Sequence, residues 1–195
     1  MAKSNLAQKI VNPSAESLAS AAKAASKRGL PPVHLWNPPF CGDLDMRIAR
    51  DGTWFYLGTP IGRKELVKLF SSILRRDGDD YFLVTPVEKV GIKVDDAPFV
   101  AVDFESTDGV LTFETQVGDF APAGPEHPIR VVRDPETGEP SPYVLIRANL
   151  EALIDRKSFY RLVDIGEVEA VDGVEWFGVK SSGTFFPIIP NAELV

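Results

Sequence analysis

The sequence is poor in cysteine and histidine, with one Cys and two His among 195 residues. A single cysteine excludes a disulfide within the chain, which fits a reducing compartment. No apolar run approaches the roughly 20 residues that a membrane-spanning helix needs. The N-terminus also lacks the apolar core of a secretory signal. We therefore expect a cytoplasmic protein that does not insert into a membrane.

Basic residues are outnumbered as well. The chain has 21 Lys and Arg against 28 Asp and Glu, a formal net charge of −7 at pH 7. Such a surface repels duplex nucleic acid unless basic residues are concentrated on one face. No run of Lys or Arg interleaved with aromatic residues is present. We expect no bulk nucleic-acid binding, whereas a small anionic ligand in a local basic pocket is compatible with this charge.

The clearest pattern in the chain runs from Gly42 to Leu74. Its first part alternates apolar and polar residues up to Asp51-Gly52, which predicts a strand ending in a tight hairpin turn. After the returning strand, Thr59-Pro60 is typical of a helix start. The apolar residues that follow recur at three- and four-residue steps and predict an amphipathic helix.

A looser copy of this pattern runs from Ile129 to Val163. A hairpin is again predicted, followed by a helix that Asn149 caps and that breaks near Lys157-Ser158. We interpret the two patterns as a duplication, against the alternative of a chance recurrence. The predicted fold is α+β, with duplicated hairpin–helix–strand units forming two packed, mainly β halves.

The domain boundaries follow from composition. Residues 1–11 look mobile, and an Ala-rich helix from Ser14 to Lys27 is expected to lie on the surface with a thin apolar face. We assign residues 1–29 to an N-terminal segment, 30–95 to the first half and 96–195 to the second half. The acidic, proline-containing stretch Asp95 to Pro98 marks the boundary between the halves.

Two groups of cations are candidates for binding an anion. Arg63 and Lys64 fall in the first turn of the first predicted helix, where a cation opposes the helix dipole unless an anion sits opposite. The alternative is a solvated pair. In the second half, arginines crowd around aromatic residues, an arrangement that suits a planar anion; pairing with the equally plentiful acids is the alternative. The arginines are Arg130, Arg133, Arg147, Arg156 and Arg161, and the aromatic residues are Tyr143, Phe159 and Tyr160.

Two other patterns favour structural readings. Asp43 and Asp45 could hold a divalent cation, but Arg47 on the same strand face favours a salt-bridged surface instead. Cys41 would need a histidine base to act as a nucleophile, and His34 and His127 are the only two present. A buried or redox-responsive thiol is the favoured interpretation.

Five segments in this order resemble the bacterial domain-of-unknown-function family 1285 over about Pro38 to Pro187. They are Asn37 to Ile48, Gly58 to Ile61 with Arg63, Thr85 to Lys89, Asp95 to Phe99, and Arg133 to Tyr143. The resemblance implies a duplicated core and a C-terminal half superficially like pleckstrin-homology folds. It also implies a nucleotide-like ligand between the halves and a role in signal transduction. The family supplies no agreed catalytic residues.

These observations lead to one main hypothesis and two alternatives. We expect a non-enzymatic ligand-sensing protein whose cleft between the halves binds a small anion, for which a nucleotide-like molecule is one candidate. A protein-interaction adapter and a Cys41-dependent hydrolase or transferase are the alternatives. No catalytic residue, metal site or cofactor is assigned. The predicted ligand-binding residues are Trp36, Arg47, Arg63, Lys64, Arg133, Tyr143 and Arg147.

Overall fold

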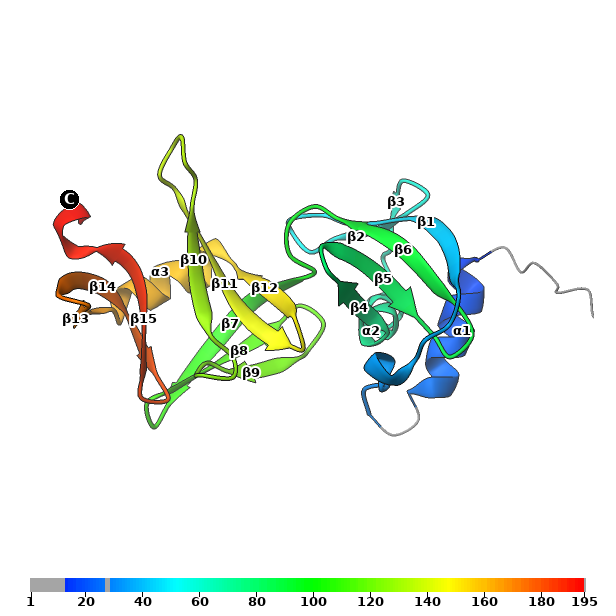
Figure 1. Ribbon diagram of the computed structural model, residues 1–195, viewed down its shortest axis with the longest axis horizontal. Coiled ribbons are helices and arrows are strands. Elements are labelled where there is room, and N and C mark those ends of the chain that lie inside the picture. Colours follow the sequence, from blue (N-terminus) through cyan, green and yellow to red (C-terminus); the bar gives the residue numbers. More distant parts are fainter. Residues whose placement is uncertain (1–12, 27–28, 195) are drawn as a thin grey trace, which may run out of the picture. The chain divides into compact units, whose positions relative to one another are not determined.

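The computed structural model describes residues 13–26 and 29–194, which form a mainly β protein with three α-helices (Figure 1). By their internal contacts these residues divide into two compact units. The first unit comprises the described residues up to 45 together with 69–92, and the second comprises 46–68 together with 93–194. The prediction of mobility for residues 1–11 falls outside the described residues. No described helix is long and apolar enough to cross a membrane.

The elements up to residue 94 build one six-stranded sheet in the order β3-β2-β1-β6-β5-β4. The helices here are α1 (Ala15–Ala25), a short 3-10 turn (Val33–Leu35) and α2 (Lys64–Ser72). The strands are β1 (Phe40–Ile48), β2 (Trp54–Tyr56), β3 (Thr59–Pro60), β4 (Leu74–Asp77), β5 (Asp80–Val84) and β6 (Lys89–Val94).

The predicted first hairpin is confirmed. β1 pairs antiparallel with β2, and Ile48 lies opposite Trp54, with both side chains almost completely buried. Gly52 closes the turn at a φ of +83°, a conformation that glycine adopts without a steric penalty. The Asp51 carboxylate accepts a hydrogen bond from the Thr53 amide at 2.9 Å, which lowers the pKa of Asp51.

The predicted helix start at Thr59-Pro60 is wrong. These two residues form β3, where Pro60 pairs with Phe55 of β2, and α2 begins only at Lys64. The reason is a second turn at Leu57 and Gly58, whose φ angles of +49° and +74° send the chain back along β2. Two paired residues directly after a tight turn are too few to show a periodic pattern, so the sequence did not predict this strand.

Helix α1 buries a narrow apolar face. Ser14 caps it through its side chain, which accepts from the Ser17 amide at 3.2 Å, as the predicted boundary requires. Leu18 and Ala22 are completely buried, although the apolar face is narrow. The other described side chains of the helix are partly or fully exposed, as expected for a surface helix.

The elements after residue 98 build a second six-stranded sheet, in the order β10-β11-β12-β7-β8-β9, and a three-stranded sheet, β13-β14-β15. β12 and β7 pair in parallel, and β9 also contacts β11, so the larger sheet curls into a half-barrel. The strands are β7 (Phe99–Thr107), β8 (Val110–Thr115), β9 (Phe120–Pro122), β10 (Ile129–Arg133), β11 (Pro140–Arg147), β12 (Leu150–Ile154), β13 (Glu167–Val171), β14 (Val174–Ser181) and β15 (Thr184–Pro190). The helices are α3 (Arg156–Asp164) and a 3-10 turn (Asn191–Glu193).

The predicted helix from Asn149 is also wrong over its first half. Leu150, Ala152 and Ile154 are buried at every second position and form β12, which pairs with β11. Ala148, at a φ of +48°, turns the chain into this strand. Asp155 then caps α3, so the helix begins at Arg156, just before the predicted break at Lys157-Ser158. Leu150 and Ile154 fit both periods, because residues four positions apart share a face of a helix and of a strand, whereas Leu153 fits only the helical period.

The two halves share an order of elements. In each, three consecutive antiparallel strands precede a nine-residue helix and three further antiparallel strands follow it: β1-β2-β3, α2 and β4-β5-β6, then β10-β11-β12, α3 and β13-β14-β15. The two meanders join in one sheet in the first case and stay in separate sheets in the second. The prediction of a mainly β protein is confirmed.

Candidate functional site

A groove of about 590 Å³ in the second unit is the candidate site. Its walls are the turn that follows β1, the loop between β10 and β11, the beginning of β11, the end of β12 and the first turns of α3. The lining residues are Arg50, Asp134, Glu139, Pro140, Ser141, Pro142, Leu153, Ile154, Asp155, Arg156, Phe159 and Tyr160.

Helix α3 presents a charged and an aromatic group to the groove. The Asp155 carboxylate accepts from the Ser158 amide at 2.7 Å, which fixes where the helix begins. Arg156, Phe159 and Tyr160 then follow at three- and four-residue spacing and share one face. On the opposite side, Ser158 and Leu162 are buried. The cap therefore decides which side chains of α3 face the groove.

A carboxylate in the loop between β10 and β11 accepts hydrogen bonds from amides of the same loop. The Asp134 Oδ1 atom accepts hydrogen bonds from the amides of Glu136 and Thr137 at 2.9 and 2.8 Å. These bonds favour the ionised form and lower the pKa of Asp134. Its charge is directed toward its own turn, which leaves less of it available to repel a ligand.

Arg50 is held in place by two partners. One guanidinium nitrogen lies 3.0 Å from Asp96 Oδ2, and another donates to Ser141 Oγ at 2.9 Å. Tyr143 donates its hydroxyl hydrogen to Asp96 Oδ1 at 2.8 Å. Burial and the neighbouring carboxylate raise the pKa of Tyr143. Asp96 thus orients an arginine whose side chain is 58% exposed at the edge of the groove.

A second arginine supports the same tyrosine. The Arg130 guanidinium lies over the Tyr143 ring, 4.4 Å from its centroid, and forms two hydrogen bonds to the Glu151 carboxylate at 2.6 and 2.7 Å. The hydrogen bonding to Glu151 raises the pKa of Arg130. A bidentate pair of this kind restricts both side chains. Arg50, Asp96, Tyr143, Arg130 and Glu151 thus form a polar network beside the groove.

Arg156 is the cation of the groove that remains available to a ligand. It is exposed and, within residues 13–26 and 29–194, makes no ion pair or side-chain hydrogen bond. The Tyr160 ring, one turn along the helix, is 59% exposed. The lining as a whole has two arginines against three carboxylates, a formal charge of −1. The groove therefore suits a ligand of low charge with a planar group, rather than a polyanion.

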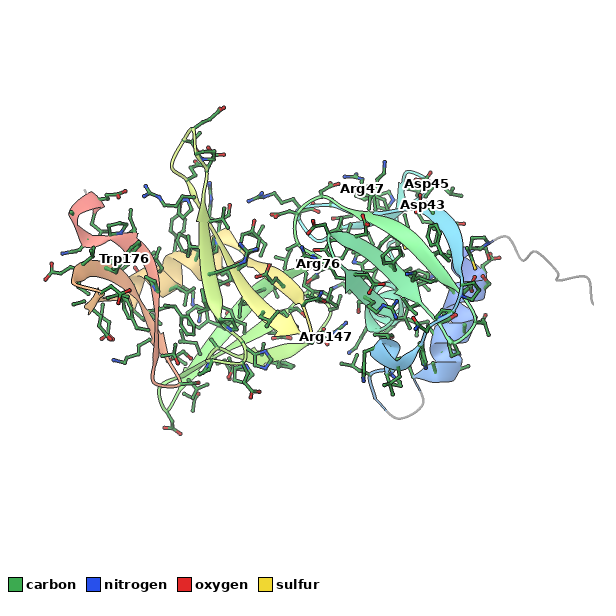
Figure 2. The ribbon with its side chains drawn as sticks, viewed as in Figure 1. Asp43, Asp45, Arg47, Arg76, Arg147 and Trp176 are labelled. Atoms are coloured by element: carbon green, nitrogen blue, oxygen red, sulfur yellow. The ribbon has the colours of Figure 1, made fainter. Side chains whose placement is uncertain are left out.

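Three of the four predicted ligand-binding arginines are paired with an acid. Arg47 lies 2.5 Å from Asp95 and stacks on the Phe55 ring. Arg133 lies 2.5 Å from Glu193. Arg147, labelled in Figure 2, pairs with Asp119 and lies over the Phe99 ring, and burial lowers its pKa. Pairing with acids, the alternative stated for the arginines of the second half, describes Arg133 and Arg147.

The other predicted ligand-binding residues lie apart from the groove lining. Arg63 and Lys64 are exposed at the start of α2. Trp36 is partly exposed, and its backbone carbonyl accepts from Arg75 at 2.7 Å. Tyr143 supports Arg50 through Asp96 but does not line the groove. Of the seven predicted residues, none lines the groove, and only Arg133 lines the small apolar pocket beside it.

Sequence reasoning missed Arg50 and did not select Arg156, Phe159 and Tyr160 for the site. The available signal was the spacing of Asp155, Arg156, Phe159 and Tyr160, a helix cap followed by a cation and two aromatic residues on one face. Because the helix was predicted to start at Asn149, Asp155 was not recognised as its cap. Nothing in the sequence marks Arg50, which depends on a partner 46 positions away in the chain.

The structure also describes the residues considered for a metal site and for a reactive thiol. Asp43, Asp45 and Arg47 follow one another along β1 (Figure 2), but Arg47 pairs with Asp95 and not with these acids. No group of three metal-binding side chains occurs in the part of the chain that the structure describes. Cys41 is exposed, not buried, and its Sγ donates to the Pro39 carbonyl at 3.4 Å.

Two family models and two solved structures are similar to this chain. The family model for the N-terminal domain of DUF1285, a domain of unknown function, matches residues 31–97. The family model for the DUF1285 C-terminal domain matches residues 98–188. The crystal structure of a DUF1285 family protein from Silicibacter pomeroyi DSS-3 is 65% identical, with a TM-score of 0.83, over 91% of this chain and 97% of that chain. One from Shewanella baltica OS155 is 32% identical, with a TM-score of 0.50, over 62% of this chain and 91% of that chain. No curated protein matches the chain.

Proposed function

The chain belongs to the DUF1285 family, and from that premise we propose that it is a non-enzymatic ligand-sensing protein that binds a small anion in the groove of the second unit. One observation carries the proposal: Arg156 and the Tyr160 ring are exposed on one face of α3, in the same groove as the anchored Arg50. Two guanidiniums beside an aromatic ring suit an anion with a planar group.

The charge of the groove narrows the class of ligand. With a formal lining charge of −1, each additional negative charge on the ligand adds repulsion from Asp134, Glu139 and Asp155. A nucleotide-like ligand with one phosphate, such as AMP or a cyclic mononucleotide, is therefore favoured over ATP. A role in signal transduction would follow if occupancy changed the surface that α3 presents to a partner.

The proposal is tested by thermal shift and NMR titration with cyclic AMP, AMP and ATP up to millimolar concentration. We expect the two monophosphates to bind more tightly than ATP. Arg156→Ala should weaken monophosphate binding about tenfold to a hundredfold, the range for a hydrogen bond to a charged group. Lys157→Ala is the matched control, because this exposed neighbour lies outside the groove. Stabilisation by none of the three nucleotides, or equal losses in both variants, would contradict the proposal.

The shared order of elements supports a second proposal about the fold. Strands, a nine-residue helix and a second meander recur in both halves, so we propose that the core arose by duplication. The pairing of β12 with β7 joins two meanders in the second six-stranded sheet, as the pairing of β1 with β6 joins two in the first, and this likeness also supports the duplication. The curled sheet and single helix α3 are the features that support a pleckstrin-homology-like description of the C-terminal half.

Exposed apolar side chains favour a protein-interaction adapter as the alternative function. Apolar side chains around α3 and the β13–β14 hairpin stay exposed, among them Val163, Ile165, Val168 and Val174. Contiguous exposed apolar groups are often interaction sites. A partner that co-purifies with the wild-type chain and is lost on Val168→Glu and Val174→Glu, with nucleotide affinity unchanged, would favour this reading.

A further inference from the structure

A small apolar pocket lies next to the groove in the second unit. Its volume is about 160 Å³, and its walls are mainly the side chains of Phe159, Val163, Phe177, Ile188, Ile189 and Leu194. These residues come from α3, β14, β15 and the last turn of the described chain. Ile188 is 6% exposed, whereas Val163 and Leu194 are 37% and 46% exposed at the opening.

The pocket and the groove share two lining residues, Phe159 and Pro140. On α3, Arg156 lies in the groove, Phe159 lines both spaces, and Val163 lines the pocket. These three residues are three and four positions apart and so share one helix face. With a rise of 1.5 Å per residue, Arg156 and Val163 are about 10 Å apart along the axis. One helix face therefore passes from a cation to an apolar wall over the length of a small organic molecule.

The charged group at the pocket rim is already neutralised. Arg133 lines the pocket, but its guanidinium lies 2.5 Å from Glu193 and its Nε donates to the Gly138 carbonyl at 3.4 Å. The pocket thus offers few polar partners to an occupant. A polar heterocycle placed there would lose hydrogen bonds to water without replacing them. An apolar group would lose none.

We infer that the apolar pocket is a subsite of the groove, and that the ligand is an amphiphilic anion: an acidic group beside Arg156 joined to an apolar group of about the size of benzene. A cavity of roughly 150 Å³ lined by Leu, Ile and Phe is large enough to hold benzene. This inference deepens the proposed function and rests on it for the acidic end of the ligand. The apolar end rests on the pocket alone.

The inference is tested with phenyl phosphate and inorganic phosphate as probes, in NMR titrations of the full chain. Burying an apolar group of this size should make phenyl phosphate bind about tenfold to a hundredfold more tightly than inorganic phosphate. Amide shifts should include residues of α3, β14 and β15. Equal affinity for the two probes, or shifts confined to other elements, would overturn the inference.

Variants separate the apolar end from the acidic end. Val163→Phe places a larger side chain at the opening and should reduce phenyl phosphate affinity at least tenfold without changing that of inorganic phosphate. Val168→Phe, at another exposed valine outside the pocket, is the matched control. Leu194→Ala removes part of the wall and should also weaken phenyl phosphate, which keeps the test decisive if Val163→Phe misfolds. Insensitivity to both pocket variants would overturn the inference.

The two proposals fail in different ways. Loss of AMP binding on Arg156→Ala, with no preference for phenyl phosphate over inorganic phosphate, would leave the proposed function standing and overturn the apolar subsite. A strong effect of Val163→Phe on phenyl phosphate, with none from Arg156→Ala on either probe, would support the pocket and overturn the acidic end in the groove.

Discussion

Asp96 shows how one side chain can decide the shape of a site. Its carboxylate accepts the Tyr143 hydroxyl and pairs with Arg50, although the side chain is only 17% exposed. The Arg50 guanidinium and Asp96 Oδ2 lie 3.0 Å apart and form an ion pair. Their geometry is not that of a hydrogen bond. A partly buried carboxylate needs such partners to offset its lost hydration. Asp96 therefore holds an arginine at the groove that would otherwise move freely in solvent.

Glu88 is the opposite case, a buried carboxyl with no ion-pair partner among the described residues. It is 8% exposed, in the turn between β5 and β6, where its amide donates to Thr85 Oγ1 at 3.2 Å. Burial raises the pKa of Glu88, and a hydrogen bond from Ser17 of α1 opposes this only in part. The folded state therefore favours the neutral acid. The stability that this group contributes is complete below the unfolded pKa of about 4.3 and is lost as pH rises through the higher folded pKa.

Replacing this group should remove its pH dependence. Glu88→Gln keeps the shape without the charge, so we expect the variant to be more stable than the wild type at pH 7 by up to about 1 kcal/mol. The difference should shrink toward pH 4. Urea denaturation at several pH values measures it, with Glu126→Gln as the exposed control. A Gln variant that loses stability at pH 7 would show that the ionised carboxylate is favoured by the fold.

At the scale of elements, the cap of α3 connects local sequence to the groove. Asp155 ends β12 and begins the helix, so it fixes both the register of Arg156 and Phe159 and the approach of the preceding strand. Helix α3 packs against β7 and β14, which holds its outer face in place. A change in the cap should therefore affect stability and ligand binding together.

We expect Asp155→Ala to lower the free energy of unfolding by about 1 kcal/mol, the usual effect of removing an N-cap. Asp155→Asn keeps an oxygen that accepts from the Ser158 amide and should retain most of the stability. Chemical denaturation measures the free energy, and the NMR shifts of residues 156–160 report the helix start. Equal losses in the Ala and Asn variants would show that the charge, and not the hydrogen bond, provides the stabilisation.

At the scale of the whole molecule, the excess of acidic residues sets which partners can approach. The net charge is −7, and the groove lining is itself slightly negative. The arginines that the sequence made prominent are largely neutralised by Asp95, Glu193, Asp119 and Glu151. This charge therefore favours small ligands of low charge over polyanions.

This charge predicts no measurable binding to duplex DNA. In fluorescence anisotropy with a labelled 20-base-pair duplex at 150 mM salt, we expect no change at micromolar protein. Lowering the salt to 50 mM should not produce binding, since a chain that neutralises no phosphates releases no counterions. Binding that strengthens steeply as salt falls would reveal a basic face that the pairing of these arginines does not suggest.

Sequence periodicity was sufficient for the first hairpin. Its strands and its Asp51-Gly52 turn were predicted because alternating burial and turn residues are local properties. Short elements were missed: β3 has two residues, and β9 has three. A strand of that length shows no period, since its pairing partner, rather than its own pattern, stabilises it.

By itself the sequence determined the acidic charge, the strand-rich character and the turn of the first hairpin, because each depends on composition or on residues close together in the chain. Only the tertiary structure decided which arginines are available. Arg47, Arg133 and Arg147 each meet a carboxylate at least 28 positions away in the chain, whereas Arg156 meets none among the described residues. Charge pairing over such separations depends on how strands and loops pack, and composition cannot distinguish a neutralised guanidinium from one that can bind a ligand.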